Sequence, residues 1–214
     1  MTRPETKNSA SGLPISAVFP VVLPVPPDKQ RLRGRSQVRY LSERARRAAG
    51  LSAEKTGVAP MDFTKSDDGA PQPQSGMYWS VSHKREYVAG VVSCYPIGID
   101  IEKIRPCSDG LIARVAAPSE WNLSSEDPSI RFFRFWTAKE AVVKAEGVGF
   151  AGFPSCRIHS VDSDRLLTVR YFLKMYRVNQ VFFHGHIAAV VCGEQEIDWE
   201  VFSGEDLEDS VNRG

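Results

Sequence analysis

The hexapeptide Ile97-Gly98-Ile99-Asp100-Ile101-Glu102 alternates isoleucines with Gly98 and two acidic residues. Because successive side chains of a β-strand point to opposite faces, a strand here buries the isoleucines and presents Asp100 and Glu102 together. Residues i and i+2 lie about 6.5–7 Å apart along a strand, so both carboxylates can reach one magnesium ion, which prefers oxygen ligands. The competing interpretation is the solvated outer face of an amphipathic strand, which is the usual place for acidic side chains.

Elements on both sides of this strand predict an α+β fold. Apolar side chains at helical spacing predict a helix over residues 29–49 that ends at Gly50, and they are Val38, Leu41, Ala45 and Ala48. Alternating or β-branched segments predict further strands, at 77–82, 87–93, 156–161, 166–172 and 186–192. Two more helices are expected, at 110–116 and 130–146.

The composition describes an ordinary globular chain that can bury a sizeable core. Its 214 residues are 42% apolar and 25% charged, with a formal net charge of +1, so the overall charge favours no particular partner. The four cysteines are widely spaced and show no zinc-binding interval, which indicates reduced thiols and a cytoplasmic protein. No apolar run is long enough to span a membrane, and residues 1–12 form a polar segment typical of a disordered tail.

A second group of candidate residues lies on the predicted helix at 130–146. Trp136, Glu140 and Lys144 are spaced i, i+4 and i+8, so they form one stripe along the helix. A carboxylate and an ammonium therefore share a face. The alternative interpretation is an ordinary stabilising Glu–Lys helix pair beside a core tryptophan.

A third group, Ser82-His83-Lys84-Arg85, stands where a predicted strand gives way to a turn. Hydroxyl, imidazole and guanidinium donors can hold a phosphate there, although turns attract polar residues in any case. Together the three groups supply carboxylates for a divalent metal and cations for phosphates, without a serine or cysteine nucleophile paired to a base. That set of side chains suits transfer of a phosphate-containing group by positioning and charge neutralisation.

At this point the sequence resembles a known family. Gly98-Ile99-Asp100-Ile101-Glu102, followed later by Trp136-x-x-Lys139-Glu140-Ala141-x-x-Lys144, is similar to the paired signature of the Sfp-type 4′-phosphopantetheinyl transferases. Ser82-His83 resembles the coenzyme A contact of that family, and the arginine-rich helix over 29–49 resembles a further basic contact region. The resemblance runs over residues 31–207.

The resemblance implies a pseudo-dimer of two similar α+β halves, residues 13–103 and 104–214, with coenzyme A in the cleft between them. It also implies a magnesium-dependent, monomeric enzyme that transfers 4′-phosphopantetheine from coenzyme A to a serine of an apo acyl or peptidyl carrier protein and releases 3′,5′-ADP. The magnesium ligands implied are Asp100, Glu102 and Glu140.

The same resemblance assigns roles to single residues. It implies that His83 contacts the 3′-phosphate of coenzyme A, that Lys144 neutralises charge on the phosphate and leaving group, and that Glu140 or a metal-bound water helps to deprotonate the serine. The catalytic set is then Asp100, Glu140 and Lys144, with Glu120 as a weaker candidate. The expected coenzyme contacts are Ser82, His83, Lys84, Lys144, Arg31 and Arg35.

One departure concerns a phosphate-binding lysine. The family often has Gly-Lys-Pro in the loop before the Ser-His strand, whereas this chain has Gly69-Ala70-Pro71, so Lys65, Lys84 or Arg85 is expected to supply that contact. The expected contacts for the carrier protein are partly apolar residues that follow the metal strand, Leu111, Ile112 and Val115.

Three other functions are compatible with parts of the sequence. A non-catalytic module that binds coenzyme A or a carrier protein is the main alternative, and the presence of every motif acid and of Lys144 speaks against it. A magnesium phosphoesterase is disfavoured because no histidine stands beside an acidic group in the sequence. A nucleic-acid partner for the arginine helix is disfavoured by the near-neutral total charge and the lack of interleaved aromatic residues.

Overall fold

The computed structural model describes residues 17–67 and 69–203, and its chain forms a mixed α+β fold with several sheets. The first sheet has the strand order β11-β2-β4-β3. Its strands are β2 (Val21–Pro24), β3 (Tyr78–His83), β4 (Tyr87–Ser93) and β11 (Glu200–Val201). A small parallel pair beside it joins β1 (Ala17–Val18) to β10 (Glu196–Ile197). The last two strands of the described chain, β10 and β11, thus pair with its first two, β1 and β2.

The second sheet has five antiparallel strands in the order β5-β9-β8-β7-β6. They are β5 (Ile99–Lys103), β6 (Cys156–Val161), β7 (Leu166–Tyr171), β8 (Lys174–Phe183) and β9 (His186–Cys192). Residues 99–103, which the sequence analysis grouped with the first half, are hydrogen-bonded to β9 in this sheet. The proposed tail, residues 1–12, lies outside the described residues.

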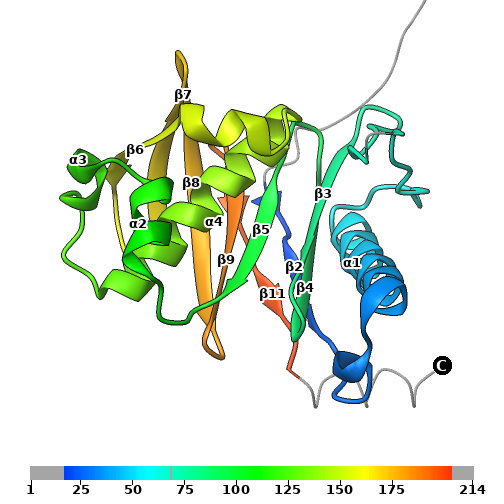
Figure 1. Cartoon of the computed structure of the whole chain (residues 1–214). Helices are drawn as coiled ribbons and strands as arrows, with labels where there is room; N and C mark the ends of the chain where they lie inside the picture. Colours follow the sequence, from blue (N-terminus) through cyan, green and yellow to red (C-terminus); the bar gives the residue numbers. More distant parts are fainter. Residues whose placement is uncertain (1–16, 68, 204–214) are drawn as a thin grey trace, which may run out of the picture.

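The four-stranded and the five-stranded sheet each carry a long helix on one face. The helix α1 (Gly34–Lys55) packs on the first sheet, and α4 (Pro128–Glu146) packs on the second. Figure 1 shows α1 beside the first of these sheets and α4 against the second. The remaining helices are short: η1 (Lys29–Arg31), α2 (Asp109–Val115), α3 (Pro118–Trp121) and η2 (Phe150–Ser155). No helix in the described part of the chain has both the length and the apolar composition needed to cross a membrane.

Both helices approach a strand at a glycine. A Cβ at Gly90 of β4 would lie 2.3 Å from the Ala49 nitrogen of α1, and one at Gly98 would lie 1.9 Å from the Ala141 carbonyl oxygen of α4. Contacts this short exclude any side chain, so glycine alone permits them. The approach at Gly98 brings the start of β5 directly against the helix that carries Glu140 and Lys144.

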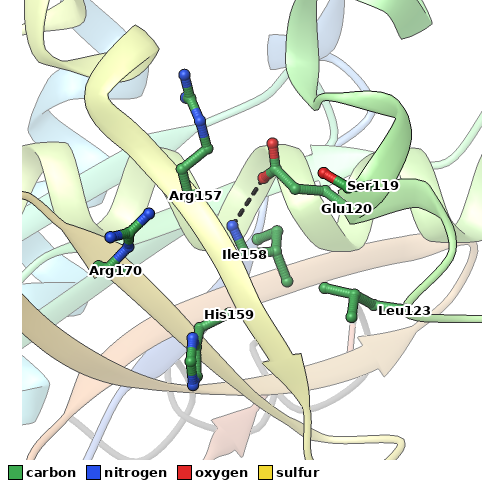
Figure 2. A pocket seen from close by; sticks show the side chains of 7 residues that line it. All are labelled: Ser119, Glu120, Leu123, Arg157, Ile158, His159 and Arg170. Carbon is green, nitrogen blue, oxygen red and sulfur yellow. Dashed lines mark hydrogen bonds between the residues drawn. The ribbon is translucent and has the colours of Figure 1, made fainter.

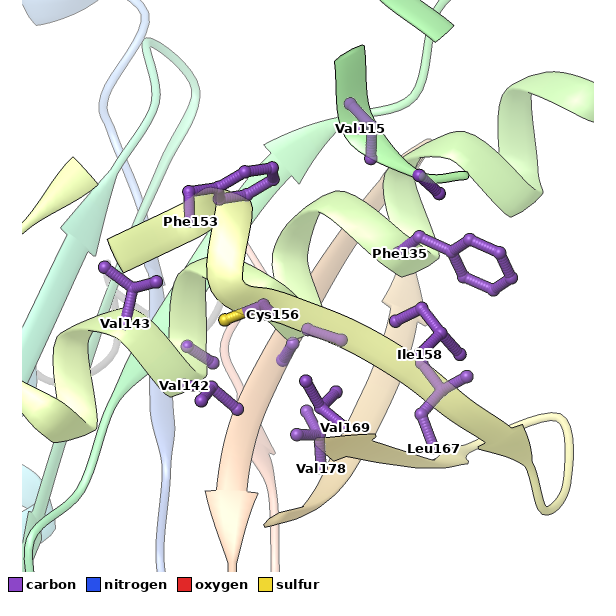
Figure 3. Packing of buried hydrophobic residues seen from close by; sticks show 14 of the residues in the cluster. Val115, Phe135, Val142, Val143, Phe153, Cys156, Ile158, Leu167, Val169 and Val178 are labelled. Atoms are coloured by element: carbon purple, nitrogen blue, oxygen red, sulfur yellow. The ribbon is translucent and has the colours of Figure 1, made fainter. Parts of the chain in front are cut away.

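The largest core cluster fixes α4 on the five-stranded sheet, and Figure 3 shows its packing. Phe135, Val142, Leu167 and Val169 are among its fully buried members. A second cluster joins the two sheets: Ile99 and Ile101 of β5 are fully buried against Ala89 and Val91 of β4. The predicted inward face of the hexapeptide is therefore confirmed, and Asp100 points away from that cluster.

The predictions on the first helix need correction, and one strand was missed. The helix begins at Gly34 and not at residue 29, since Lys29–Arg31 form the separate short helix η1. The first helix does not stop at Gly50 but continues to Lys55, because Ser52 and Ala53 in its last turns are buried. Val38 belongs to that helix but is 57% exposed, so it is not part of the apolar face. The strand β8 was not predicted. Its sequence KMYRVNQVFF mixes polar and apolar residues, and the strand buries Val178 and Gln180 while most of its other residues stay accessible.

Candidate active site

The two acidic residues of β5 lie at the junction of the two sheets, next to α4. The Asp100 carboxylate is nearly buried and receives two hydrogen bonds on the same oxygen, Oδ1: one from Lys144 Nζ at 2.7 Å and one from Ser82 Oγ at 2.8 Å. Lys144 Nζ also donates to the Ile99 carbonyl at 2.9 Å. Glu102 accepts from Lys84 Nζ at 2.7 Å. The sequence-predicted residues from three separate segments therefore meet here.

Glu140 completes an acidic group around Asp100. Burial is the main cause that raises the pKa of Glu140 to about 7, and the charges of Asp100 and Glu102 add to it while Lys144 opposes it. Burial likewise raises the pKa of Glu102, followed by the charge of Asp100. Carboxylates placed this close together repel one another when ionised. A cation among them would relieve that repulsion.

Two buried oxygens of this group have no hydrogen-bond partner: Asp100 Oδ2 and Glu140 Oε1. An unpaired buried carboxylate oxygen is costly, and hard divalent cations such as magnesium take oxygen ligands of this kind. The donor set thus fits a divalent metal. Among the described residues, no three His, Cys, Asp or Glu side chains are arranged to hold a metal ion. Lys144 and Lys84 are instead paired with Asp100 and Glu102.

A pocket of about 290 Å³ opens beside Asp100 and carries an excess of positive charge. It is lined by Ser42, Arg46, Lys65, Val81, Ser82, His83 and Lys144. Burial lowers the pKa of Lys65, and the charges of Arg46 and Lys144 lower it further. Desolvation by the pocket walls, then the charges of Lys144 and Lys84, lowers the pKa of the His83 imidazole. Such mutual repulsion among cations marks a place where an anion is stabilised.

The pocket includes some of the predicted coenzyme contacts and not others. Ser82, His83 and Lys144 line it, as does Lys65, which was one of three candidates to replace the family lysine. Arg31 and Arg35 are both exposed and are not among its lining residues.

Other expected contacts are engaged elsewhere. Lys84 is paired with Glu102, and Arg85 donates to the Gln30 carbonyl.

Two lining residues, Ser42 and Arg46, were missed by the sequence analysis. They lie one turn apart on α1, and Arg46 also donates to the Phe63 carbonyl. At 100° per residue, positions 35, 42 and 46 fall within about 40° of one another around the helix. The shared face was therefore readable in the sequence, but which turn of that face meets the pocket depends on the packing of α1 against β3 and β4.

Glu120, the weaker catalytic candidate, is part of a different arrangement. Its Oε1 accepts from Lys139 Nζ at 2.6 Å and from the Ile158 amide at 2.7 Å, and its Oε2 accepts from the Ala117 amide at 2.8 Å. Both oxygens are thus satisfied by groups of α4, β6 and the start of α3. Glu120 ties these elements together, which is a structural role and not the expected catalytic one.

The hollow next to Glu120 has a volume of about 390 Å³ and lies away from Asp100. Figure 2 shows that Arg157, His159 and Arg170 line it but point in different directions. The Arg157 guanidinium donates to the neighbouring Pro154 and Cys156 carbonyls. These cations do not converge on one point, so this hollow lacks the arrangement that makes the pocket at Lys144 suitable for an anion.

The expected carrier contacts lie on α2 and also need revision. Val115 is 3% exposed and belongs to the core cluster under α4, while Leu111 and Ile112 are half-buried against that cluster. Val115 cannot contact a partner without unfolding the segment that covers it.

Comparison with known proteins finds similarity over the part of the chain that carries Asp100, Glu140 and Lys144. Residues 96–197 match the family model described as the 4′-phosphopantetheinyl transferase superfamily. The 4′-phosphopantetheinyl transferase ffp of Bacillus subtilis is 33% identical over 99 residues, which are 44% of this chain and 44% of that protein. HetI of Nostoc sp. is 39% identical over 85 residues, or 36% of each chain. Svp of Streptomyces mobaraensis is 32% identical over 146 residues, or 62% of this chain and 55% of Svp. The chain spans about half the length of the curated relatives it matches.

Proposed function

We propose that this chain moves 4′-phosphopantetheine from coenzyme A to a serine of an apo acyl or peptidyl carrier protein, because its residues 96–197 match the 4′-phosphopantetheinyl transferase superfamily model and its relatives carry that name. The observation that carries the proposal is the placement of two unpartnered, buried carboxylate oxygens, Asp100 Oδ2 and Glu140 Oε1, beside a basic pocket. A metal-dependent transfer of a phosphate-containing group from a pyrophosphate to a hydroxyl needs both features at one place.

The pocket binds the phosphates of coenzyme A in this proposal. Arg46, Lys65 and His83 supply donors on the side of α1 and β3, and His83 contacts the 3′-phosphate. Lys144, at the other end of the pocket, donates to the pyrophosphate. A guanidinium can form paired hydrogen bonds with phosphate oxygens, whereas lysine acts as a point charge.

Magnesium is the proposed cofactor, held by Asp100, Glu102 and Glu140. When bound, it neutralises pyrophosphate charge and withdraws electron density from the phosphate under attack. Asp100 and Glu140 offer the free oxygens noted above, and Glu102 becomes available when Lys84 turns from it to an incoming anion.

The chemistry is one substitution at phosphorus. The serine oxygen of the carrier forms a bond to the β-phosphate, and the bond from that phosphate to 3′,5′-ADP breaks. Glu140, or a water molecule held beside it, takes the serine proton. Lys144 neutralises the charge that grows on the leaving phosphate.

We also propose a pseudo-dimeric organisation of two halves, residues 13–103 and 104–214, each with a long helix packed on a sheet. Each half gives one strand to the sheet of the other, β5 from the first and β11 from the second. The active site then lies where the halves meet, with Ser82 and His83 from the first and Glu140 and Lys144 from the second. The protein acts as a monomer in this proposal, because both halves of the site come from one chain. Its place in the cytoplasm is proposed from the widely spaced cysteines.

Intact-mass spectrometry of apo carrier proteins incubated with this protein, coenzyme A and magnesium tests the function. A mass gain of one phosphopantetheine that needs magnesium is the expected result. Asp100→Ala is expected to abolish it, and Asp28→Ala, which changes a carboxylate on the surface near η1, is expected to leave it intact. Coenzyme A binding without any mass gain would instead support a non-catalytic binding module.

A further inference from the structure

The turn that joins β7 to β8 exposes two large apolar side chains. Phe172 is 65% exposed and Leu173 is 100% exposed. Tyr171 and Lys174 are paired across the turn, so Phe172 and Leu173 are its two central residues. Figure 1 shows this turn projecting beyond the five-stranded sheet. Apolar side chains stabilise a fold by being buried, and these two contribute no such burial.

The backbone of the same turn is also unfavourable. Phe172 has a φ of 50°, in the left-handed region that bulky side chains rarely adopt. Two-residue hairpin turns usually take Asn-Gly or Asp-Gly, because those residues tolerate a positive φ. Phe-Leu at this place therefore costs the fold stability in both backbone and side chain. Exposed apolar residues in a strained turn are candidates for contact with another molecule.

The hairpin is tied to α4, the helix that carries Glu140 and Lys144. Lys174 Nζ donates to the Glu146 carboxylate at 3.0 Å, and Tyr176 Oη donates to the same carboxylate. Glu146 follows Lys144 by two residues in the last turn of α4. A partner that contacts this hairpin therefore lies beside the end of the helix at the active site.

The short helix η2 extends the apolar surface toward the active site. Phe150 is 64% exposed, and its ring centroid lies 6.2 Å from that of Trp136. Trp136 precedes Glu140 by four residues, or about one turn of α4. A Cβ at Gly152 would lie 3.3 Å from Tyr171 Oη, so η2 lies against the base of the hairpin. Exposed apolar groups thus begin near Glu140 and continue to the turn.

Two arginines beside the hairpin repel each other. Arg157 of β6 and Arg170 of β7 are paired across the two strands, and both are exposed. Like charges in such positions destabilise a sheet, and neither arginine forms an ion pair within the described part of the chain. Met175, which is 50% exposed, is paired with Arg170 and continues this row toward the turn. Because the two guanidinium groups point in different directions (Figure 2), they suit an extended acidic surface and not one small anion.

We propose that η2 and the β7–β8 hairpin form a docking surface for the carrier protein, which contacts it through apolar and acidic side chains. The inference rests on the proposed function, since the carrier is the substrate whose serine must reach Glu140. A carrier seated there covers the exposed apolar groups and supplies the negative charge that the two arginines lack. We call this surface the hairpin face, and its residues are Phe150, Phe172, Leu173, Met175, Arg157 and Arg170.

Steady-state kinetics of the full chain with apo acyl and apo peptidyl carrier proteins test the hairpin face. Phe172→Asn removes the ring and supplies a residue that tolerates the left-handed backbone. It is expected to raise the KM for the carrier by about tenfold, to leave the KM for coenzyme A unchanged and to cost no stability. Leu173→Ser is expected to act in the same way. Arg170→Gln is expected to raise the carrier KM and to reduce its dependence on salt.

A control separates docking from a general effect on the fold. Phe182→Ser also removes an exposed aromatic ring from β8, but at the opposite end of that strand from the hairpin turn. It is expected to change the carrier KM by less than about twofold. Chemical denaturation of the Phe172→Asn protein completes the comparison. A purely structural role for the turn predicts a loss of stability there and a rise in both KM values together.

Three results would overturn the inference while the transferase activity remains. The first is a carrier KM that does not change in Phe172→Asn and Leu173→Ser. The second is binding to vesicles of phosphatidylcholine and phosphatidylserine that Leu173→Ser abolishes without a change in carrier KM, which would assign the hairpin face to a membrane. The third is a dimer, measured by sedimentation, that Leu173→Ser dissociates without a change in carrier KM.

Failure of the proposed function would give a different result. If the unaltered protein modifies no carrier, binding of the same apo carriers is measured by calorimetry. Binding that Leu173→Ser weakens and Phe182→Ser does not would support the hairpin face in a non-catalytic module. Absence of any carrier binding would overturn the inference together with the function.

Discussion

Lys139 and Lys144 of α4 each form an ion pair with a carboxylate. The two pairs differ in whether every carboxylate oxygen has a hydrogen-bond partner. Lys139 pairs with Glu120 at 2.6 Å, and the side chains are 1% and 5% exposed. Lys144 pairs with Asp100 at 2.7 Å, and the side chains are 28% and 7% exposed. Five residues correspond to about 140° around an α-helix, so the two lysines serve different faces of α4.

The difference lies in the remaining atoms of each pair. Lys139 also donates to the Val115 carbonyl, and the amides of Ile158 and Ala117 donate to Glu120, so both oxygens of that carboxylate have a partner. Around Lys144, Asp100 Oδ2 has no partner although it is buried. We call the Lys139–Glu120 pair closed, because both carboxylate oxygens have partners, and the Lys144–Asp100 pair open, because one oxygen has none. A closed pair holds elements together, whereas an open pair can still bond a ligand. Burial alone therefore does not distinguish a catalytic pair from a structural one.

The largest effect is expected when the closed pair is broken. Lys139→Met leaves the Glu120 charge buried without its cation, and removing one partner of a buried pair costs about 3–5 kcal/mol. Chemical denaturation measures this as a loss of unfolding free energy. Adding Glu120→Gln to the same variant removes the uncompensated charge and should recover part of the loss. If Lys139→Met were as stable as the unaltered protein, the closed pair would not hold the helix in place.

Breaking the open pair should affect transfer more than stability. Lys144→Met removes a donor to developing charge, and losses of this kind lower rates by about 10²–10³-fold. Its unfolding free energy should fall less than that of Lys139→Met, because the Lys144 side chain is 28% exposed and solvent reaches this pair through the pocket. Carrier modification and denaturation are measured on the same preparation. Equal stability losses at Lys139 and Lys144 would remove the distinction between the two pairs.

The third prediction concerns the cations facing the open pair across the pocket. Arg46→Gln is expected to weaken coenzyme A binding by about 10–150-fold, since a charged hydrogen bond contributes about 1.5–3 kcal/mol. Arg35→Gln is the matched control on the same helix face, two turns away from the pocket residues, and should change the affinity by less than about twofold. Calorimetry with coenzyme A and with 3′,5′-ADP measures both. A larger loss in Arg35→Gln would restore the contact expected from the sequence.

The sequence predicted the elements whose periodicity is strong. The alternation in 97–102 identified β5, its buried isoleucines and the direction of Asp100, and the spacing of Glu140 and Lys144 correctly placed both on one helix. β8 was not predicted because its polar and apolar residues do not alternate regularly along the chain. The helix end at Gly50 was wrong because burial of the following turn outweighs the preference of glycine for a helix terminus.

The partners of single side chains were not predictable from local patterns. Lys139 and Glu120 are distant in sequence, and nothing in their spacing shows that one neutralises the other. Ser82 was expected to contact the coenzyme, and the structure adds a partner that its local sequence does not show, the Asp100 carboxylate on another sheet. Arg46 could not be chosen among the arginines of α1 until the packing of that helix was known. Local sequence thus located the site, and long-range contacts decided which residues complete it.

The smallest effect expected is on the pH dependence of thermal stability, through Glu140. Burial and the nearby charge of Asp100 raise the pKa of this carboxyl from 4.5 to about 7. Between these values the folded protein keeps the proton that the unfolded chain has released, so stability falls as the pH rises through this window and levels off above it. Glu140→Gln carries no such charge and should lose this dependence.

The measurement is the Tm of the metal-free protein at pH 5 and at pH 8. Glu140→Gln is expected to raise the Tm by about 2–4 °C at pH 8, and to leave it nearly unchanged at pH 5, where Glu140 is already protonated in the fold. Glu120→Gln, in the closed pair, should lower the Tm at both pH values because it disrupts bonds that are fully formed. If the Tm of the two variants shifted in the same direction at both pH values, the carboxylate oxygens of Glu140 would be as fully hydrogen-bonded as those of Glu120. A gain at pH 8 confined to Glu140→Gln would show that the open pair stands beside a carboxylate whose charge the fold itself does not neutralise.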